Sequence, residues 1–304
     1  MNSYVLGVGG PWANGGPGGG NSDYIGAFGS TNAYPVVLHG SANLTLTGVN
    51  QLRPSRIGSG VPVTDFSGTY IVQAVNGSLM ALPGTGRSNW TTGNFAIASG
   101  AIVQMGEGTS DDVSVTYAHT ISGSGTWVIR NSQTLTLGSG GIVRPGSAGA
   151  SDAATLTFGD SSSNTNITFA SGSDVKMDII DASTSDKLLF PAPYSAATVT
   201  IGSGAKLDID LFTPSITTPI TNMVLWDANY TGVTLSGSYS IGNITYNNST
   251  GWTGLSIVET GNQILLNGTY TASAPPAVPE PATLLLVGTG VVGALGFIRR
   301  RRMS

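Results

Sequence analysis

The side chains suited to acid–base chemistry are few and widely spaced. The sequence contains two histidines, His39 and His119, and no cysteine. His119 follows Asp112 closely enough for a β-helix hydrolase to pair the two as a general base and its partner. Asp111 and Asp112 are adjacent, so on a strand their carboxylates would point to opposite faces, which suits a turn better than catalysis. We therefore expect His119 to be an ordinary surface residue.

A second acidic pair, Asp208 and Asp210, shares one strand face with Lys206. Alternate strand residues are about 7 Å apart, a separation that two catalytic carboxylates of a glycosidase can have. Their position in a regular alternating strand favours a solvated face instead. The sequence therefore predicts no catalytic residues.

Metal chemistry has one candidate cluster, four aspartates close together in the sequence, whose oxygens would suit calcium. Two of them are more typical of turns, and the glycine-rich nonapeptide of calcium-binding β-rolls is absent from the sequence. P-loop, G-x-S-x-G and H-E-x-x-H motifs are also absent. We expect no metal site and no cofactor; the four aspartates are Asp174, Asp178, Asp181 and Asp186.

Thr-x-Thr triplets recur along the chain. Stacked in register on a flat β-helix face, they would resemble the surfaces of some ice-binding proteins. Threonine is also the best polar strand former, so ordinary outward threonines are the expected reading. Four of these triplets are Thr45/Thr47, Thr134/Thr136, Thr155/Thr157 and Thr198/Thr200.

The composition excludes nucleic-acid binding. Charged residues make up only 9% of the chain, against about 25% in an average protein, and there are 44 glycines. Without the residues from 278 onward, 15 acidic and 8 basic side chains leave a net charge of −7. Such a body has no basic face to hold phosphates.

Short apolar/polar alternations broken by Gly, Ser, Asn or Pro predict many short strands and no helix before residue 278. Glycines at the corners and coils of about 20 residues favour a stack of repeating units. We predict an all-β fold: a right-handed parallel β-helix, or β-solenoid, followed by one C-terminal transmembrane helix. The clearest strands are 44–46, 113–115, 135–137, 156–158, 167–169, 199–201, 207–211, 233–235, 244–246 and 264–266.

Residues 121–211 resemble autotransporter passenger domains and the autotransporter-like repeats often joined to sorting tails. Gly141–Ser147 and Leu156–Gly159 look like one coil, and Val175–Ile179 with Ser185–Leu188 look like the next, with its Ser-Asp-x-Leu turn. This chain inserts Ala150–Ala154 within the first coil. The resemblance implies a body of stacked repeating β-coils.

Changes in composition divide the chain into six predicted parts. They are a glycine-rich irregular segment (1–40), a β-solenoid (41–211), a C-terminal β capping region (212–270), a Pro/Ala linker with a sorting motif (271–281), a transmembrane helix (282–298) and a basic cytoplasmic tail (299–304).

The C-terminal part carries the clearest signal. The apolar stretch 282–298 contains no charge, and as a helix it would span roughly 26 Å, near the lower limit for crossing a bilayer. Prolines delay the helix start, and the basic cluster after the stretch should stay cytoplasmic, which puts residues 1–277 across the membrane. The motif is Val278, Pro279, Glu280 and Pro281, and the cluster is Arg299, Arg300, Arg301 and Arg302.

These residues resemble the PEP-CTERM sorting signal of Gram-negative bacteria that make exopolysaccharide. The same tail is also catalogued as an ice-binding protein C-terminal domain. The resemblance implies recognition of Pro279–Pro281 by an exosortase, a membrane processing enzyme. It also implies a single-pass precursor in the bacterial inner membrane and a mature protein at the cell surface or outside. Family members carry an N-terminal secretion signal, whereas Met1–Gly20 shows no such pattern, which favours a misassigned or truncated start.

Three functions remain open. The leading one is an exported, non-enzymatic surface or matrix protein, with exopolysaccharide as a possible partner. The alternatives are a surface binding module for carbohydrate or ice, and a polysaccharide-active β-helix enzyme. The enzyme would need charged side chains gathered in one groove, for example Arg130 and Arg144 with nearby aspartates. The arginines before the tail are Arg53, Arg56, Arg87, Arg130 and Arg144.

Overall fold

The regular secondary structure in the described part of the protein is almost wholly β-strand, as the alternating pattern predicts. A computed structural model divides the chain into two units, 1–270 and 271–304, and all the residues that it describes lie in the first. These are residues 3–7, 23–25, 41–47, 50–52, 66–73, 79–82, 93–105, 114–129, 133–147, 153–162, 164, 166–212 and 218–270.

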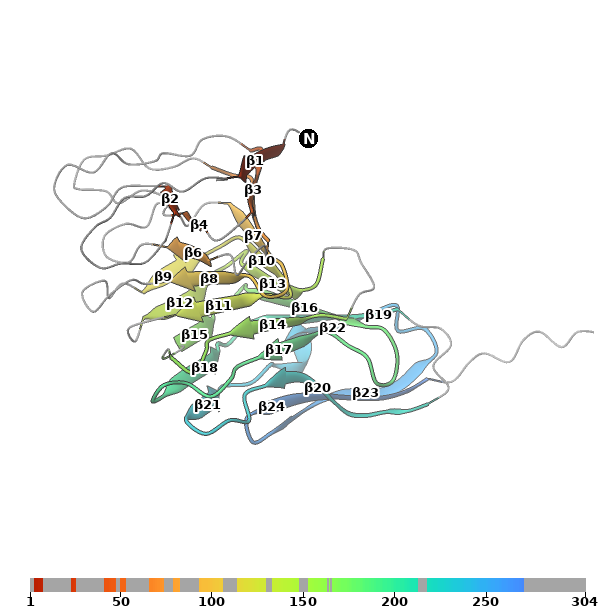
Figure 1. Ribbon diagram of the computed structural model, residues 1–304. Coiled ribbons are helices and arrows are strands. Elements are labelled where there is room, and N and C mark those ends of the chain that lie inside the picture. The colour runs from red at the N-terminus through yellow and green to blue at the C-terminus, as the bar shows by residue number, and fades with distance from the viewer. Residues whose placement is uncertain are drawn as a thin grey trace, which may run out of the picture. The chain divides into compact units, whose positions relative to one another are not determined.

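The strands form three sheets, here named A, B and C (Figure 1). Sheet A contains β1 (Ser3–Gly7), β3 (Asn43–Thr47), β5 (Thr69–Val72), β7 (Asn94–Ile97), β10 (Thr120–Gly123), β13 (Ile142–Pro145), β16 (Asp174–Ile179), β19 (Lys206–Leu211) and β22 (Ile244–Asn247). Sheet B contains β2 (Asp23–Ile25), β4 (Asn50–Leu52), β6 (Leu79–Leu82), β8 (Ile102–Met105), β11 (Thr126–Ile129), β14 (Thr155–Phe158), β17 (Lys187–Leu189), β20 (Ile220–Asp227), β24 (Gln263–Tyr270) and β23 (Trp252–Thr260). Sheet C contains β9 (Val115–Tyr117), β12 (Thr134–Leu137), β15 (Asn166–Phe169), β18 (Ala197–Ile201) and β21 (Val233–Ser236).

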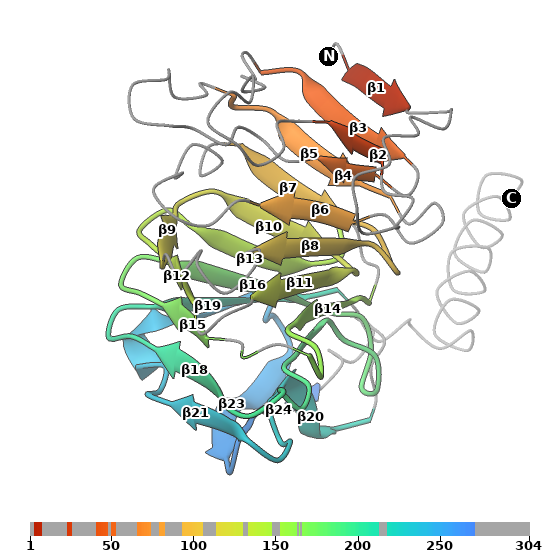
Figure 2. The ribbon, with the colours of Figure 1, turned by 60° about the vertical axis from the view of Figure 1, so that its left-hand side comes forward.

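The chain visits the sheets in turn, so that each coil lies on the one before it. From β10 onward it runs through A, B and C, returns to A at β13, and repeats this course to β22. Neighbouring strands of consecutive coils are parallel, and Figure 2 shows them stacked one above another. The predicted all-β solenoid with parallel sheets is therefore confirmed. The coil length varies: Leu135 pairs with Val115 after the predicted 20 residues, but Asp208 pairs with Lys176 after 32.

The core lies between the three sheets, and the alternation of each strand fills it. In sheet C the inward residues Leu135, Ile167 and Val199 are paired in successive strands and are all buried. Aromatic rings fill the wider parts: Trp226 packs against Phe169, with ring centroids 4.7 Å apart, and against Phe190 at 5.6 Å. Burying these apolar side chains supplies the main driving force for stacking the coils.

One corner glycine is required by its surroundings. Gly123 ends β10 with φ +106°, a conformation that residues with a side chain rarely adopt. A Cβ atom there would lie 2.1 Å from the carbonyl oxygen of Ile97 in the coil below. The sharp turn into β11 therefore depends on glycine.

An antiparallel hairpin follows the last parallel strands of the solenoid. Beyond residue 211, strands β20, β21 and β22 add to all three sheets, and a 3₁₀ turn (Ile241–Asn243) precedes β22. Strand β24 then pairs antiparallel with β20, and β23 pairs antiparallel with β24. The region predicted as a cap, 212–270, thus contains both further parallel strands and an antiparallel hairpin. The segment predicted as irregular, 1–40, contains β1 and β2.

The predicted transmembrane helix, 282–298, lies outside the described residues. Within the residues that are described, no helix has the length and apolar character needed to cross a membrane.

Candidate functional site

Outward charges gather on sheet A, where one lysine joins two coils. The Lys176 ammonium on β16 lies 3.0 Å from the Asp174 carboxylate on its own strand. It also lies 3.0 Å from the Asp208 carboxylate on β19, the strand that follows in the sheet. The in-register parallel pairing of β16 and β19 brings the three side chains together.

A second set of ionic contacts lies two residues further along β16 and β19, at Asp178 and Asp210. Arg144 on β13 donates from Nη2 to both carboxylate oxygens of Asp178 on β16, at 3.0 and 3.1 Å. The same nitrogen lies 3.9 Å from Asp210 on β19. Arg144 therefore contacts carboxylates on two strands beyond its own, and these contacts neutralise much of the acidic charge on this face.

The acidic pair considered for glycosidase chemistry, Asp208 and Asp210, lies within this network. Partial burial opposes ionisation of Asp208, but the hydrogen bond and charge of Lys176 lower its pKa overall. Burial of Asp174 raises its pKa, although the same lysine works against that rise. Since the pKa of Asp174 is raised and the pKa of Asp208 is lowered, a proton added to the pair goes to Asp174 first. The arrangement fits ionic links between coils better than acid–base catalysis at Asp208 and Asp210.

Asp186 lies at a corner of the solenoid, where it is buried and not exposed like an ordinary turn residue. Its side chain is fully buried and accepts hydrogen bonds from the backbone N–H of Ala154 at 3.0 Å and of Asp178 at 2.9 Å. Burial raises the pKa of Asp186 to about 7; the two N–H donors and Arg144 lower it, and Asp178 adds to the rise. The carboxylate thus joins the loop before β14 to strand β16.

The four aspartates considered for calcium do not converge on a common point. Asp174 contacts Lys176, Asp178 contacts Arg144, and Asp186 accepts backbone N–H groups. Asp181 accepts from the backbone N–H and hydroxyl of Ser183, at 2.7 and 2.8 Å. In the part of the chain that the structure describes, no group of His, Cys, Asp and Glu is placed to hold a metal ion.

The remaining catalytic candidates are not brought together. His119 lies between β9 and β10, and its ring packs edge to face on Tyr117 with centroids 5.6 Å apart. Its proposed partner Asp112 lies outside the described residues, as do His39, Asp111, Arg53, Arg56, Arg87 and Arg130.

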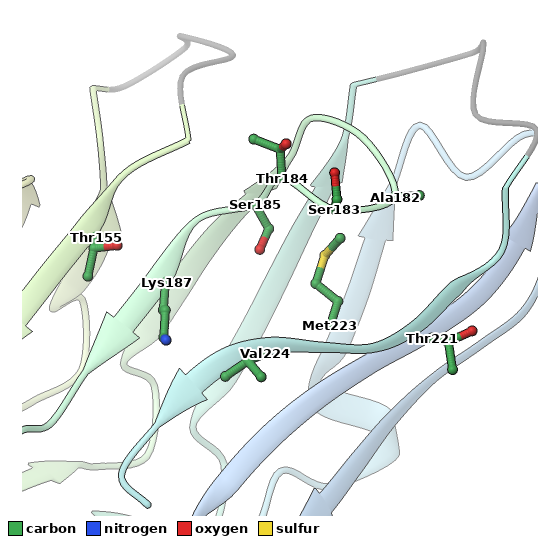
Figure 3. A pocket seen from close by; sticks show the side chains of 9 residues that line it. All are labelled: Thr155, Ala182, Ser183, Thr184, Ser185, Lys187, Thr221, Met223 and Val224. Carbon is green, nitrogen blue, oxygen red and sulfur yellow. The ribbon is translucent and has the colours of Figure 1, made fainter.

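A polar hollow lies between strand β20 and the loop before β17 (Figure 3). It has a volume of about 440 Å³, and its lining includes the apolar side chains of Met223 and Val224. The Lys187 ammonium is bound to Asp227 at 2.9 Å, and none of the described lining residues is Asp, Glu or His. The hollow thus offers hydroxyl groups and one paired cation, but no general acid or base. The hydroxyl groups belong to Thr155, Ser183, Thr184, Ser185 and Thr221.

A second hollow, about 390 Å³, lies at the end of the solenoid beside β22 and β23. Ile244, Tyr246 and Ile257 contribute to its lining, and Ile241 at its edge is 91% exposed. Buried Tyr239 donates its backbone N–H to Glu259, which is the one acid in the described lining. A single carboxylate in an apolar hollow gives no catalytic pair.

The Thr-x-Thr triplets separate onto different sheets. Thr45/Thr47 lie on β3 in sheet A and Thr155/Thr157 on β14 in sheet B. The other two triplets, Thr134/Thr136 and Thr198/Thr200, lie on β12 and β18 of sheet C, with β15 between them. A Thr-x-Thr search misses β15 and β21, whose outward residues are Asn166, Thr168, Thr234 and Ser236. Allowing Ser and Asn in the search would have found them.

The comparison with protein families concerns the tail. Residues 277–302 match the model of the PEP-CTERM protein-sorting motif. The chain carries a PEP-CTERM motif. The match includes Val278–Pro281 and Arg299–Arg302, which lie outside the described residues, so their individual roles stay predictions. The PEP-CTERM motif covers a small part of the chain, and the likeness of the body to autotransporter repeats also stays a prediction. No curated protein matches the chain.

Proposed function

We propose that this protein is exported and delivered through its PEP-CTERM motif to an exosortase-type membrane enzyme. The match at 277–302 is the observation that carries the proposal. The precursor is held in the bacterial inner membrane by residues 282–298, with Arg299–Arg302 on the cytoplasmic side and the solenoid outside. Processing near Pro279–Pro281 then releases the body to the cell surface or the extracellular matrix.

The body acts as a structural component without enzymatic activity. Three of the aspartates that a hydrolase would need are bound to basic side chains on sheet A: Asp208 to Lys176, and Asp178 and Asp210 to Arg144. The described lining of the polar hollow contains no acid or histidine. A polysaccharide-active enzyme would instead need free acid and base groups on one substrate-binding face.

The proposal is tested by processing in a bacterium that contains an exosortase, compared with the same strain lacking the enzyme. The full chain is produced behind a secretion signal, and its mass and its membrane and extracellular fractions are measured. We expect a smaller, released form only in the first strain. Replacing Pro279 and Pro281 with alanine should abolish it.

The matched control replaces Pro275 and Pro276, two prolines of the same linker that lie outside the matched range. We expect normal processing of this variant. Equal release from both strains, or from the Pro279/Pro281 variant, would refute the proposal. Sedimentation of the released body with the exopolysaccharide of the host tests matrix association.

A further inference from the structure

Sheet C presents a two-dimensional array of small uncharged polar side chains, here called the hydroxyl face. Along each strand that the structure describes in this sheet, two outward residues flank one inward apolar residue; Val115, Leu135, Ile167 and Val199 are buried and Leu235 is partly buried. Figure 2 shows these strands lying one beside another along the solenoid. The outward residues, strand by strand, are Ser114/Thr116, Thr134/Thr136, Asn166/Thr168, Thr198/Thr200 and Thr234/Ser236.

The strand register places these side chains in two straight files. Thr116, Thr136, Thr168, Thr200 and Ser236 are paired from strand to strand and form one file. The Thr200 and Ser236 hydroxyls at its end lie 3.2 Å apart, so their side chains occupy the same face. The other file runs through Thr134, Asn166, Thr198 and Thr234 in the same way.

The array is regular and stiff. Neighbouring strands are about 4.8 Å apart, and alternate residues of one strand about 6.8 Å, so the side chains form a nearly rectangular lattice. Threonine is branched at Cβ and has few rotamers, which lets each residue present one methyl and one hydroxyl group in a fixed direction. The buried residues beneath keep the strands from shifting register, because a slip of one position would expose them.

Charge is separated between the sheets. The contacts of Arg144 and Lys176 with four aspartates all lie on sheet A. The strands of sheet C carry no Asp, Glu, Lys, Arg or His at any position. These strands therefore offer a partner hydrogen bonds but no charged group. The outward positions also include no aromatic residue, so a dissolved sugar would find no ring to stack against.

A rigid hydroxyl lattice is better suited to a solid than to a dissolved molecule. Each hydrogen bond to a ligand replaces one to water and contributes only about 0.5–1.5 kcal/mol. A crystal surface loses no rotational freedom of its own on contact, and a preorganised face loses little, so many weak contacts add up. Oxygen atoms on the surfaces of ice repeat at distances close to the two spacings of this array. We propose that the hydroxyl face binds ice.

This binding does not depend on delivery by the tail, so it is tested on the purified full chain in detergent. The readouts are the gap between melting and freezing temperature, the shape of growing ice crystals and the inhibition of recrystallisation. The decisive variant is Thr198→Tyr, which places a bulky ring on the exposed face of β18. The matched control is Thr155→Tyr, at the exposed first threonine of a Thr-x-Thr triplet on sheet B.

We expect faceted crystals and a freezing gap with the unchanged protein and with Thr155→Tyr, and the loss of both with Thr198→Tyr. A second variant, Thr198→Val, keeps the shape of the side chain and the fold, and should reduce the gap less. Absence of a freezing gap in the folded protein at high concentration would overturn the proposal, and so would equal loss in the two tyrosine variants. Binding to a neutral polysaccharide gel that Thr198→Tyr removes, without any effect on ice, would overturn it in favour of a glycan.

Discussion

The Arg144 guanidinium on β13 binds both carboxylate oxygens of Asp178 on β16, at 3.0 and 3.1 Å. Asp178 is only 1% exposed and Arg144 is 13% exposed, so water screens this pair poorly. The parallel stacking of coils, which places β13 beside β16, is what allows residues 34 positions apart to meet. The pair connects consecutive coils where the chain makes no covalent link.

Replacing Arg144 with leucine should destabilise the protein by about 3 kcal/mol, because a buried carboxylate loses its cation. Arg144→Lys should restore only part of this, since an ammonium is more strongly hydrated than a guanidinium and costs more to bury. Urea unfolding of each variant measures the change. Lys187→Ala is the control: its contact with Asp227 is 32% exposed on the lysine side and should contribute less than about 1 kcal/mol. Equal losses in the two variants would contradict the prediction.

The buried Asp186 makes stability depend on pH in an unusual direction. Because its pKa is raised to about 7, the folded protein binds this proton more tightly than the unfolded chain does. The contribution of Asp186 to stability is therefore greatest below the ordinary carboxyl pKa, and it is lost as the pH rises to about 7. Asp186→Asn should flatten the change in urea midpoint over this range.

Asp181 provides a comparison of opposite sign, because hydrogen bonds from Ser183 lower its pKa. Asp181→Asn should leave the fall in stability toward neutral pH in place. If the slope is the same in Asp186→Asn as in the unchanged protein, the carboxylate does not titrate as stated.

Gly123→Ala should destabilise the solenoid strongly. The new Cβ would meet the Ile97 carbonyl oxygen at 2.1 Å in a backbone conformation that alanine rarely adopts. Gly254 on β23 also has a positive φ, +63°, but a Cβ there meets nothing within 4 Å. Gly254→Ala should therefore cost only the backbone strain, about 1–2 kcal/mol. Thermal unfolding of both variants separates the steric clash from the strain, and equal losses would exclude the clash.

The alternation of apolar and polar residues was enough to predict the all-β class and the parallel stack, because burial of one strand face is a local property of the sequence. It did not predict β1 and β2, which lie in the segment expected to be irregular. The partners of individual residues were not predictable. Lys176 meets Asp208 after 32 residues, whereas Lys187 meets Asp227 after 40, since loops of different length intervene. Without a fixed coil length, the sequence alone could not show which Thr-x-Thr triplets lie side by side.

Asp186 shows the same limit for a single residue. Its position after Ser185 predicts a turn, and it does lie at a corner of the solenoid. Its burial depends on Ala154, which is 32 positions earlier and donates a backbone N–H to it. No local pattern reveals such a donor, so the shifted pKa was missed.

The antiparallel hairpin at the end of the solenoid limits how copies of this protein can assemble. Within the described residues, sheets A and C end on β22 and β21 of the last coil, whereas sheet B continues through β24 to β23. The three sheets therefore end at different levels in this part of the chain. A second molecule cannot extend all three at once, as the next coil of the same chain would. The antiparallel hairpin therefore disfavours end-to-end stacking of copies into a continuous three-sheet solenoid at this end.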